Sequence, residues 1–191
     1  MSLLLSIYAW MLARFPEVFA RLNAGIWGWG LWILRRGLIQ RNLAASFPEK
    51  DAAWVRRIGK LSCFRTAEMG LYSLAAAKMS EAEIRQRVTV HPDTIPSFTT
   101  PTPEGRGNVY FIPHFNLMEM MTAVTLYAGP QPEWHTLYRP LNQPSLDHWV
   151  KTSRERFGVK LVSRREGFTQ LMQAVRRGQN AAILFDQNTH S

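Results

Sequence analysis

The pattern of hydrophobic and polar positions changes once along the 191-residue chain, near residue 108. Before that point, apolar residues recur at helical spacing, with breaks before Pro48 and at Ser80, where Ser80-x-x-Glu83 has the form of a capping box. After it, short runs of β-branched and aromatic residues alternate with segments of helical period. The expected strands cover 109–113, 134–138, 159–162 and 181–185, and the expected helices cover 116–128, 145–157 and 167–177.

This alternation predicts an α/β fold with a mostly parallel sheet and flanking helices, since parallel strands need crossover connections that are usually helical. A segment rich in Pro and Gly lies between the helical part and the α/β part and is typical of a connection. The sequence therefore predicts four parts. They are an N-terminal helix or hairpin over 1–35, a helical region over 36–90, the connection over 91–107 and the α/β part over 108–191.

Two apolar runs near the N-terminus, 3–13 and 24–34, are each shorter than the roughly 18–20 residues that a membrane-spanning helix needs. No basic segment precedes the first run, which argues against a cleaved signal peptide. The second run carries three tryptophans and ends at Arg35 and Arg36, a combination that favours the headgroup level of anionic lipid. The alternatives are a helix or hairpin lying in a membrane surface and a core helix pair of a soluble protein; the clustered tryptophans favour the membrane surface.

The stretch 108–119 combines a buried strand with polar side chains suited to chemistry. Pro113 and His114 follow the apolar run, Asn116 is a good helix cap, and Glu119 lies in the first helical turn. His114 is therefore expected at the carboxyl end of a strand, the edge of an open α/β sheet where ligands bind. A neutral histidine there could take a proton from an alcohol that attacks a carbonyl, with a glutamate fixing its tautomer. The competing interpretation is that Asn116-x-x-Glu119 is a capping box and His114 an ordinary loop residue.

Composition narrows the classes of partner. Lys+Arg of 23 against Asp+Glu of 14 gives a net charge of +9, which favours an anionic partner. The basic residues are spread among apolar helices without a recognition motif, which argues against nucleic acid. The single cysteine, Cys63, excludes an intramolecular disulfide and a cysteine-based zinc site. The five histidines show no ligand spacing, so neither a metal nor another cofactor is expected.

Several segments, taken in order, resemble the bacterial lipid A late acyltransferases, a branch of the lysophospholipid acyltransferase superfamily. The superfamily places an aspartate five positions after its histidine, whereas the lipid A branch places a glutamate there, as this chain does. The resemblance extends from residue 35 to the end of the chain. The matching segments are Arg36…Asn42-Leu-Ala-Ala-Ser46-Phe-Pro-Glu49, His114-Phe-Asn-Leu-Met-Glu119, Tyr138-Arg-Pro-Leu-Asn142, Arg154…Phe157-Gly158, Arg164-Arg-Glu166 and Asp186-Gln187.

The resemblance implies a mostly parallel sheet of the glycerolipid acyltransferase kind and a membrane-associated amino end. It also implies transfer of a fatty acyl chain from acyl carrier protein to a hydroxyl of a lipid A precursor, at the cytoplasmic face of the cell inner membrane. His114 would be the general base and Glu119 its orienting carboxylate. No serine or cysteine nucleophile is needed for such direct transfer, and no Gly-x-Ser-x-Gly motif occurs.

Four further positions carry over from the resemblance. Arg139 and Arg164 would bind substrate, since a guanidinium binds phosphate or carboxylate bidentately and a lipid A precursor carries both kinds of anion. The alternative for each arginine is a solvated surface charge. Asn116 and Asp186 would support the site.

Two further expectations concern the completeness of the chain and the alternative functions. The chain ends at Ser191, soon after an expected central strand, and the family's chains are longer. We therefore expect a fragment that lacks the C-terminal part of the α/β domain. The alternative functions are an acyltransferase acting on a lysophospholipid or another glycolipid, and a non-catalytic membrane-binding module.

Overall fold

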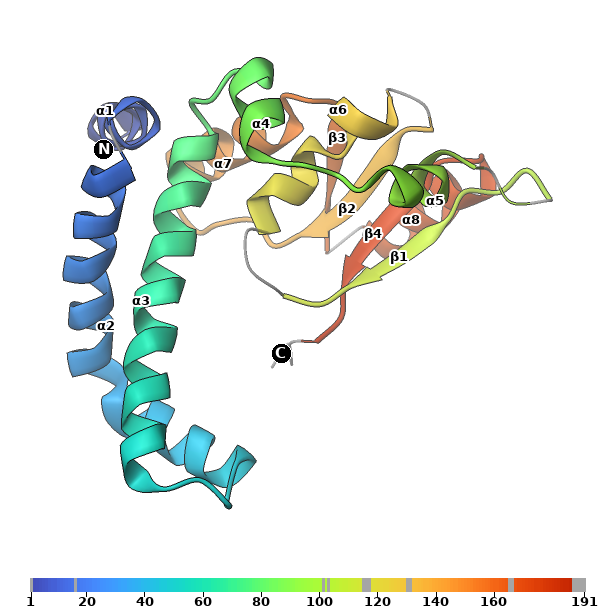
Figure 1. Ribbon diagram of the computed structural model, residues 1–191. Helices are drawn as coiled ribbons and strands as arrows, with labels where there is room; N and C mark the ends of the chain where they lie inside the picture. Colours follow the sequence, from blue (N-terminus) through green and yellow to red (C-terminus); the bar gives the residue numbers. More distant parts are fainter. Residues whose placement is uncertain are drawn as a thin grey trace. The chain divides into compact units, whose positions relative to one another are not determined.

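The computed structural model describes residues 2–15, 17–100, 102, 104–114, 118–129, 132–164 and 167–186. The chain divides into two compact units, both drawn in Figure 1. The helical unit covers residues 4–78, and the α/β unit covers residues 79–191 together with residues 1–3. The four-part division of the chain stays a prediction.

The helical unit is built from α1 (Ser2–Arg14), α2 (Glu17–Ser46) and α3 (Ala52–Ala76). The second apolar run and the residues after it form one helix, α2, which ends before Pro48 as its sequence predicts. Asp51 caps α3, because its side chain accepts a hydrogen bond of 2.7 Å from the backbone N–H of Trp54. α2 and α3 lie side by side as a hairpin (Figure 1).

Small residues set the close approach of α2 and α3. A Cβ added at Gly28 would lie 2.7 Å from the Cα of Phe64, so the backbones meet at this point. A Cβ added at Gly59 would lie 2.7 Å from Cζ3 of Trp32, whose indole packs directly on α3. Further along α3 the buried positions include Cys63 and Ala67, which are again small. Small residues therefore allow the two helices to approach closely, and Trp32, Val55 and Leu71 are buried in the same unit.

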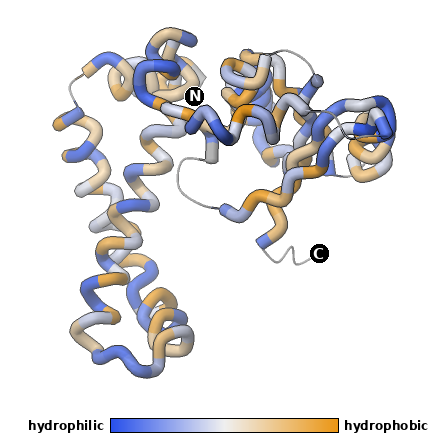
Figure 2. Tube along the Cα trace, turned by 45° about the vertical axis from the view of Figure 1, so that its right-hand side comes forward, coloured by the Kyte–Doolittle hydropathy of each residue, from blue (hydrophilic) through white to orange (hydrophobic). Residues whose placement is uncertain are grey.

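Many large apolar residues of the helical unit are exposed on its surface. Trp10, Trp27 and Trp29 keep 51%, 59% and 69% of their surface exposed. Figure 2 shows hydrophobic stretches alternating with hydrophilic ones along the hairpin. Among the described residues, no helix has both the length and the apolar character needed to cross a membrane.

The α/β unit begins with α4 (Glu81–Arg87), whose N-terminus carries the predicted capping box. Ser80 Oγ accepts from the N–H of Glu83, and the Glu83 carboxylate accepts from the N–H of Ser80. The remaining elements are η1 (Pro92–Thr94), α5 (Ile95–Thr99), β1 (Val109–Ile112), η2 (Met118–Ala123), α6 (Thr125–Ala128), β2 (Trp134–Tyr138), α7 (Pro144–Glu155), β3 (Val159–Ser163), α8 (Gly167–Arg176) and β4 (Asn180–Leu184).

The four described strands form one parallel sheet in the order β1-β4-β2-β3. β4 lies between β1 and β2, pairing Ala181 with Val109 on one side and with His135 on the other. This arrangement confirms the predicted α/β class, with N-terminal helices followed by an all-parallel sheet and flanking helices. All four strands end at the same edge of the sheet, because they run in the same direction.

The two faces of the sheet carry separate cores. On one face, Trp134 stacks on Tyr110 with ring centroids 4.7 Å apart, and α6 covers them through Val124 and Ala128. On the other face, α8 packs Leu171 and Val175 against the sheet, where Ala181 is fully buried. Adjacent residues of a strand point to opposite faces, which is why such short strands can serve both cores.

One buried polar residue ties the start of the sheet together. Asn180, fully buried at the start of β4, accepts from the backbone N–H of Asn108 and donates to the carbonyl of Phe98, both at 3.0 Å. Next to it, a Cβ added at Gly107 would lie 1.7 Å from the carbonyl oxygen of Gln179, so only glycine fits. These contacts fix β1 against β4.

Two details differ from the sequence-based prediction. The connection over 91–107 contains two short helices, η1 and α5, which its prolines allow because proline is accepted in a first helical turn. The helix predicted over 116–128 is a 3-10 helix over Met118–Ala123 followed by the short α6, and residues 115–117 lie outside the described residues. The apolar spacing identified a helical segment but did not distinguish the two helix types.

Candidate active site

Polar side chains follow all four strands within two residues of their carboxyl ends. His114 follows β1, Arg139 follows β2, Arg164 follows β3 and Asp186 follows β4. Because the strands are parallel, these four positions share one edge of the sheet, where open α/β sheets bind ligands. Since β1 and β4 are neighbours, His114 and Asp186 are brought together although they are 72 residues apart.

His114 is held by Asp186 at two points. Nδ1 of the ring lies 2.6 Å from Oδ1 of Asp186, and the backbone N–H of His114 donates to Oδ2 at 2.8 Å. With Nδ1–H donating to the carboxylate, the other ring nitrogen, Nε2, carries the lone pair. The His114 side chain is 34% exposed, so the ring is open to solvent rather than enclosed in apolar packing. This is the geometry of an oriented base.

The electrostatics of Asp186 follow from the same contacts. Hydrogen bonds from the ring and then from the backbone N–H of His114 hold the pKa of the Asp186 carboxyl below its usual value. The carboxylate therefore stays ionised into acid solution and can stabilise an imidazolium at His114.

Glu119 makes a different contact in the structure. Its carboxylate, on η2, accepts from the guanidinium of Arg154 on α7, with Nε 2.9 Å from Oε2 and a second bond from the terminal nitrogen to Oε1. The pair is bidentate and partly buried, so it anchors η2 to α7. The structure thus brings Glu119 to Arg154 and His114 to Asp186. The predicted pairing of His114 with Glu119 stays a prediction.

The other predicted positions differ in what the structure says of them. Arg139 and Arg164 are both exposed, and the backbone N–H of Arg164 donates to the carbonyl of Tyr138 at 3.1 Å, which keeps the ends of β2 and β3 together. Within the part of the chain that the structure describes, neither guanidinium has a carboxylate partner. Asn116 lies outside the described residues.

No metal centre is apparent in the described part of the chain, where no group of three or more His, Cys, Asp or Glu side chains could hold an ion. Cys63 is buried on α3, and burial raises the pKa of its thiol.

Arg154 is the site residue to which the sequence analysis gave no role. Its segment formed part of the resemblance, but no spacing rule connects a residue near the end of one helix to a glutamate 35 positions earlier. The direct bond from His114 to Asp186 was likewise not predicted, since it depends on β4 lying next to β1. The available signal in the sequence was the carboxylate of Asp186, which directly follows the strand expected over 181–185.

The family model described as bacterial lipid A biosynthesis acyltransferase matches residues 2–191. The comparison with curated proteins finds no significant match.

Proposed function

Since the chain belongs to the bacterial lipid A biosynthesis acyltransferase family, we propose that it moves a fatty acyl chain from acyl carrier protein to a hydroxyl of a lipid A precursor. Family membership makes the protein an acyltransferase of lipid A biosynthesis. The donor, the acceptor hydroxyl and the roles of the residues are the proposed part. The observation that carries the proposal is the exposed His114 ring, oriented by Asp186 at 2.6 Å.

In the proposed reaction, Nε2 of His114 takes the proton of the acceptor hydroxyl as its oxygen attacks the thioester carbonyl carbon. The C–S bond then breaks, and the leaving thiolate recovers the proton from the imidazolium. Asp186 stabilises the imidazolium formed between these two steps. No covalent acyl-enzyme is required, because the acceptor oxygen itself attacks the thioester.

Glu119 is proposed as the second acidic group of the site, keeping the His114–Glu119 dyad implied by the resemblance. Its distinct contact with Arg154 supports two separable roles for the carboxylates. Asp186→Asn leaves a hydrogen-bond acceptor at Nδ1 without the charge and is expected to lower kcat by about 100-fold or more. Glu119→Gln breaks the ion pair with Arg154, and Arg154→Gln serves as its matched control. If Glu119 acts only through Arg154, both variants lose the same activity; if it acts on His114, Glu119→Gln loses more.

Arg139 and Arg164 are proposed to bind anionic groups of the acceptor. Both guanidinium groups lie at the carboxyl edge of the sheet and are exposed to solvent, which supports binding of phosphate or carboxylate. Their substitution by Gln is expected to raise KM for the acceptor more than it lowers kcat. Acyl carrier protein is acidic, so its docking to a chain of net charge +9 is expected to weaken with salt.

Attachment to the cytoplasmic face of the inner membrane is proposed for the helical unit. The exposed tryptophans of α1 and α2 support this, because indole rings favour the headgroup level. Flotation with vesicles tests it. Trp27→Ser with Trp29→Ser is expected to release the protein from vesicles, whereas Phe168→Ser, an equally exposed apolar site on α8, should leave binding unchanged.

The central test is mass spectrometry of lipid A from cells that carry the wild-type gene, the gene with His114→Ala, or no gene. The wild-type gene should add the mass of one acyl chain to lipid A, and the variant should add none. Equal acylation by wild type and variant would overturn the role of His114. An acyl chain found on lysophospholipid instead of lipid A would overturn the proposed acceptor.

A further inference from the structure

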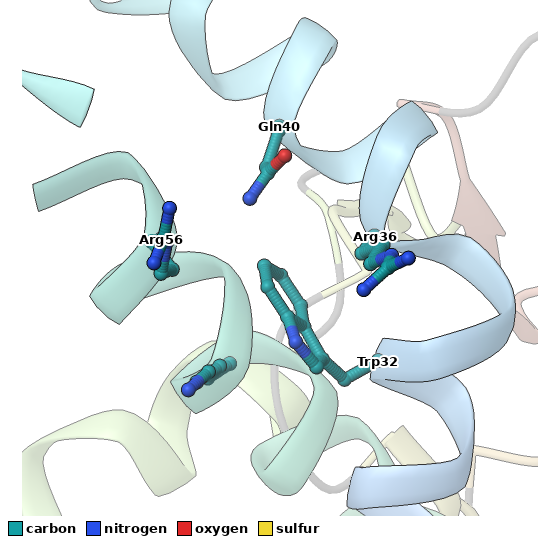
Figure 3. A pocket seen from close by; sticks show the side chains of 5 residues that line it. Trp32, Arg36, Gln40 and Arg56 are labelled. Atoms are coloured by element: carbon teal, nitrogen blue, oxygen red, sulfur yellow. The ribbon is translucent and has the colours of Figure 1, made fainter. Parts of the chain in front are cut away.

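The helical unit contains a basic pocket that the proposed reaction does not use. Its volume is about 390 Å³, and it lies between α2 and α3, lined by Trp32, Arg36, Gln40, Arg56 and Lys60. In Figure 3 the indole of Trp32 extends between the two helices, with Arg36 and Gln40 on the α2 side and Arg56 on the α3 side. From this pocket we infer a binding site for a phosphate monoester carried on a lipid headgroup.

The helical repeat explains how five residues far apart in sequence converge. Trp32, Arg36 and Gln40 are spaced by four along α2, so they share one face of that helix. Arg56 and Lys60 are spaced by four along α3 and share the face opposite. The contact of Trp32 with Gly59 places the indole between the two rows, where it lines the pocket. Trp32 is only 8% exposed, so its position is fixed by packing.

The pocket carries a surplus of positive charge among the described residues. Three cationic side chains line it and no carboxylate does. Within the part of the chain that the structure describes, Arg36, Arg56 and Lys60 take part in no ion pair with an acidic side chain. Holding three like charges around one cavity is unfavourable, and a bound anion would relieve that repulsion. The cluster belongs to a unit with eleven basic and four acidic side chains, so +7 of the chain's +9 lies here.

The number of cations favours a phosphate monoester over a diester. A monoester phosphate offers three terminal oxygens and a charge of −1.5 to −2 at neutral pH, whereas a diester offers two terminal oxygens and one charge. Two guanidinium groups and an ammonium supply matching donors around the cavity, and guanidinium groups bind phosphate bidentately. The pocket is also too small for a folded partner, which would contact the helix surface instead.

The surroundings favour a lipid as the source of the phosphate. Ile33, Leu34 and Leu38 lie on α2 within the same turns as the pocket residues and are 46%, 79% and 45% exposed. An amphiphile with a phosphate headgroup would meet both the cations and these apolar side chains. Free phosphate would meet the cations alone, so it should bind more weakly. The site is built from residues of the helical unit alone, so its binding can be measured apart from acyl transfer.

Binding to vesicles and to inorganic phosphate tests the site with the full chain. The vesicles contain phosphatidylcholine with phosphatidic acid, a phosphate monoester, or with phosphatidylglycerol, a diester, at matched surface charge. Wild type should bind phosphatidic acid vesicles about tenfold more tightly than phosphatidylglycerol vesicles. Equal binding to the two would overturn the inference, as would tighter binding of inorganic phosphate than of phosphatidic acid vesicles, which would make the source a soluble anion.

The chain offers a matched pair of double variants. Arg36→Gln with Arg56→Gln removes two pocket cations, and Arg35→Gln with Arg57→Gln removes their sequence neighbours, which do not line the pocket. The net charge changes equally. The pocket variant should lose the preference for phosphatidic acid, and the neighbour variant should keep it. Equal loss in both would show general charge attraction and overturn the site. His114→Ala should bind as wild type does, so failure of the acyl transfer proposal leaves this result unaffected.

Discussion

The two units differ in how their elements pack together and in how much large apolar surface they leave exposed. In the helical unit, the contact between α2 and α3 includes small residues such as Gly28, Gly59 and Ala67, and many large apolar side chains are exposed. In the α/β unit, aromatic side chains such as Trp134 and Tyr110 form the core of the sheet. A water-soluble domain gains stability by burying its large apolar residues, whereas helices packed through small residues suit an apolar surrounding. If the helical unit attaches to a membrane as proposed, its exposed apolar side chains would meet lipid, whereas the core of the α/β unit is shielded from solvent by its own helices.

The largest expected effect is on the α/β unit, from Gly107→Ala. The new Cβ would lie 1.7 Å from a backbone carbonyl oxygen of Gln179, so β1 cannot keep its place beside β4. We expect a loss of about 4 kcal/mol or more in the free energy of unfolding. Hydrogen exchange measured by mass spectrometry should show the loss over residues 104–186, with α2 and α3 protected as in wild type. Loss of protection in both units would show that they do not unfold separately.

The second-largest loss of stability is expected on removal of the buried amide of Asn180. Asn180→Ala leaves the N–H of Asn108 and the carbonyl of Phe98 without their partner and opens a cavity. Each unsatisfied buried group costs about 1–3 kcal/mol, so a total of roughly 3 kcal/mol is expected. Denaturant unfolding followed by near-ultraviolet circular dichroism of the aromatic core would measure it. The exposed Asn42→Ala on α2 provides the control and should change stability by less than about 0.5 kcal/mol.

A third, smaller effect is expected in the helical unit. Gly28→Ala places a Cβ 2.7 Å from the Cα of Phe64 and pushes α2 from α3, at a cost of about 1–3 kcal/mol. Gly37→Ala, on the same helix with open space around it, should instead stabilise by up to about 1 kcal/mol through helix propensity. Hydrogen exchange measured over residues 17–76 should show lower protection in Gly28→Ala and equal or higher protection in Gly37→Ala. Similar changes in both variants would contradict packing through small residues.

The smallest expected effect is a dependence of the stability of the α/β unit on pH. Burial lowers the pKa of His135 in the folded protein, against the attraction of Glu133. The unfolded chain therefore takes up the proton at a higher pH than the folded protein does. Stability should fall as the pH drops below about 6.5, and stop falling below the lowered folded pKa. His135→Gln should flatten this slope in denaturant titrations between neutral and mildly acid pH; an unchanged slope would assign it to other groups.

Local patterns in the sequence predicted the elements well. β2 occupies the predicted 134–138, and the Ser80–Glu83 capping box begins α4 as its spacing indicates. Such features depend on neighbouring residues alone. The 3-10 geometry of η2 was not predictable, because α and 3-10 helices share similar apolar spacing.

The candidate site was predictable in position but not in its contacts. Each residue after a strand could be assigned to the carboxyl edge of the sheet before the strand order was known. Which of them touch depends on that order: His114 meets Asp186 because β4 lies beside β1. The bond from Arg154 to Glu119 likewise requires the packing of α7 on η2. Contacts between residues this far apart in the sequence leave no periodic pattern from which they could be predicted.

The central place of β4 has a consequence for biosynthesis. Of the four described strands, β4 is translated last, yet β1 pairs with it alone. Until residues 180–186 have left the ribosome, β1 has no hydrogen-bonding neighbour among these four strands, and the contact of His114 with Asp186 cannot form. The contacts between α2 and α3 lie within residues 4–78, so they can form while the rest of the chain is still being made.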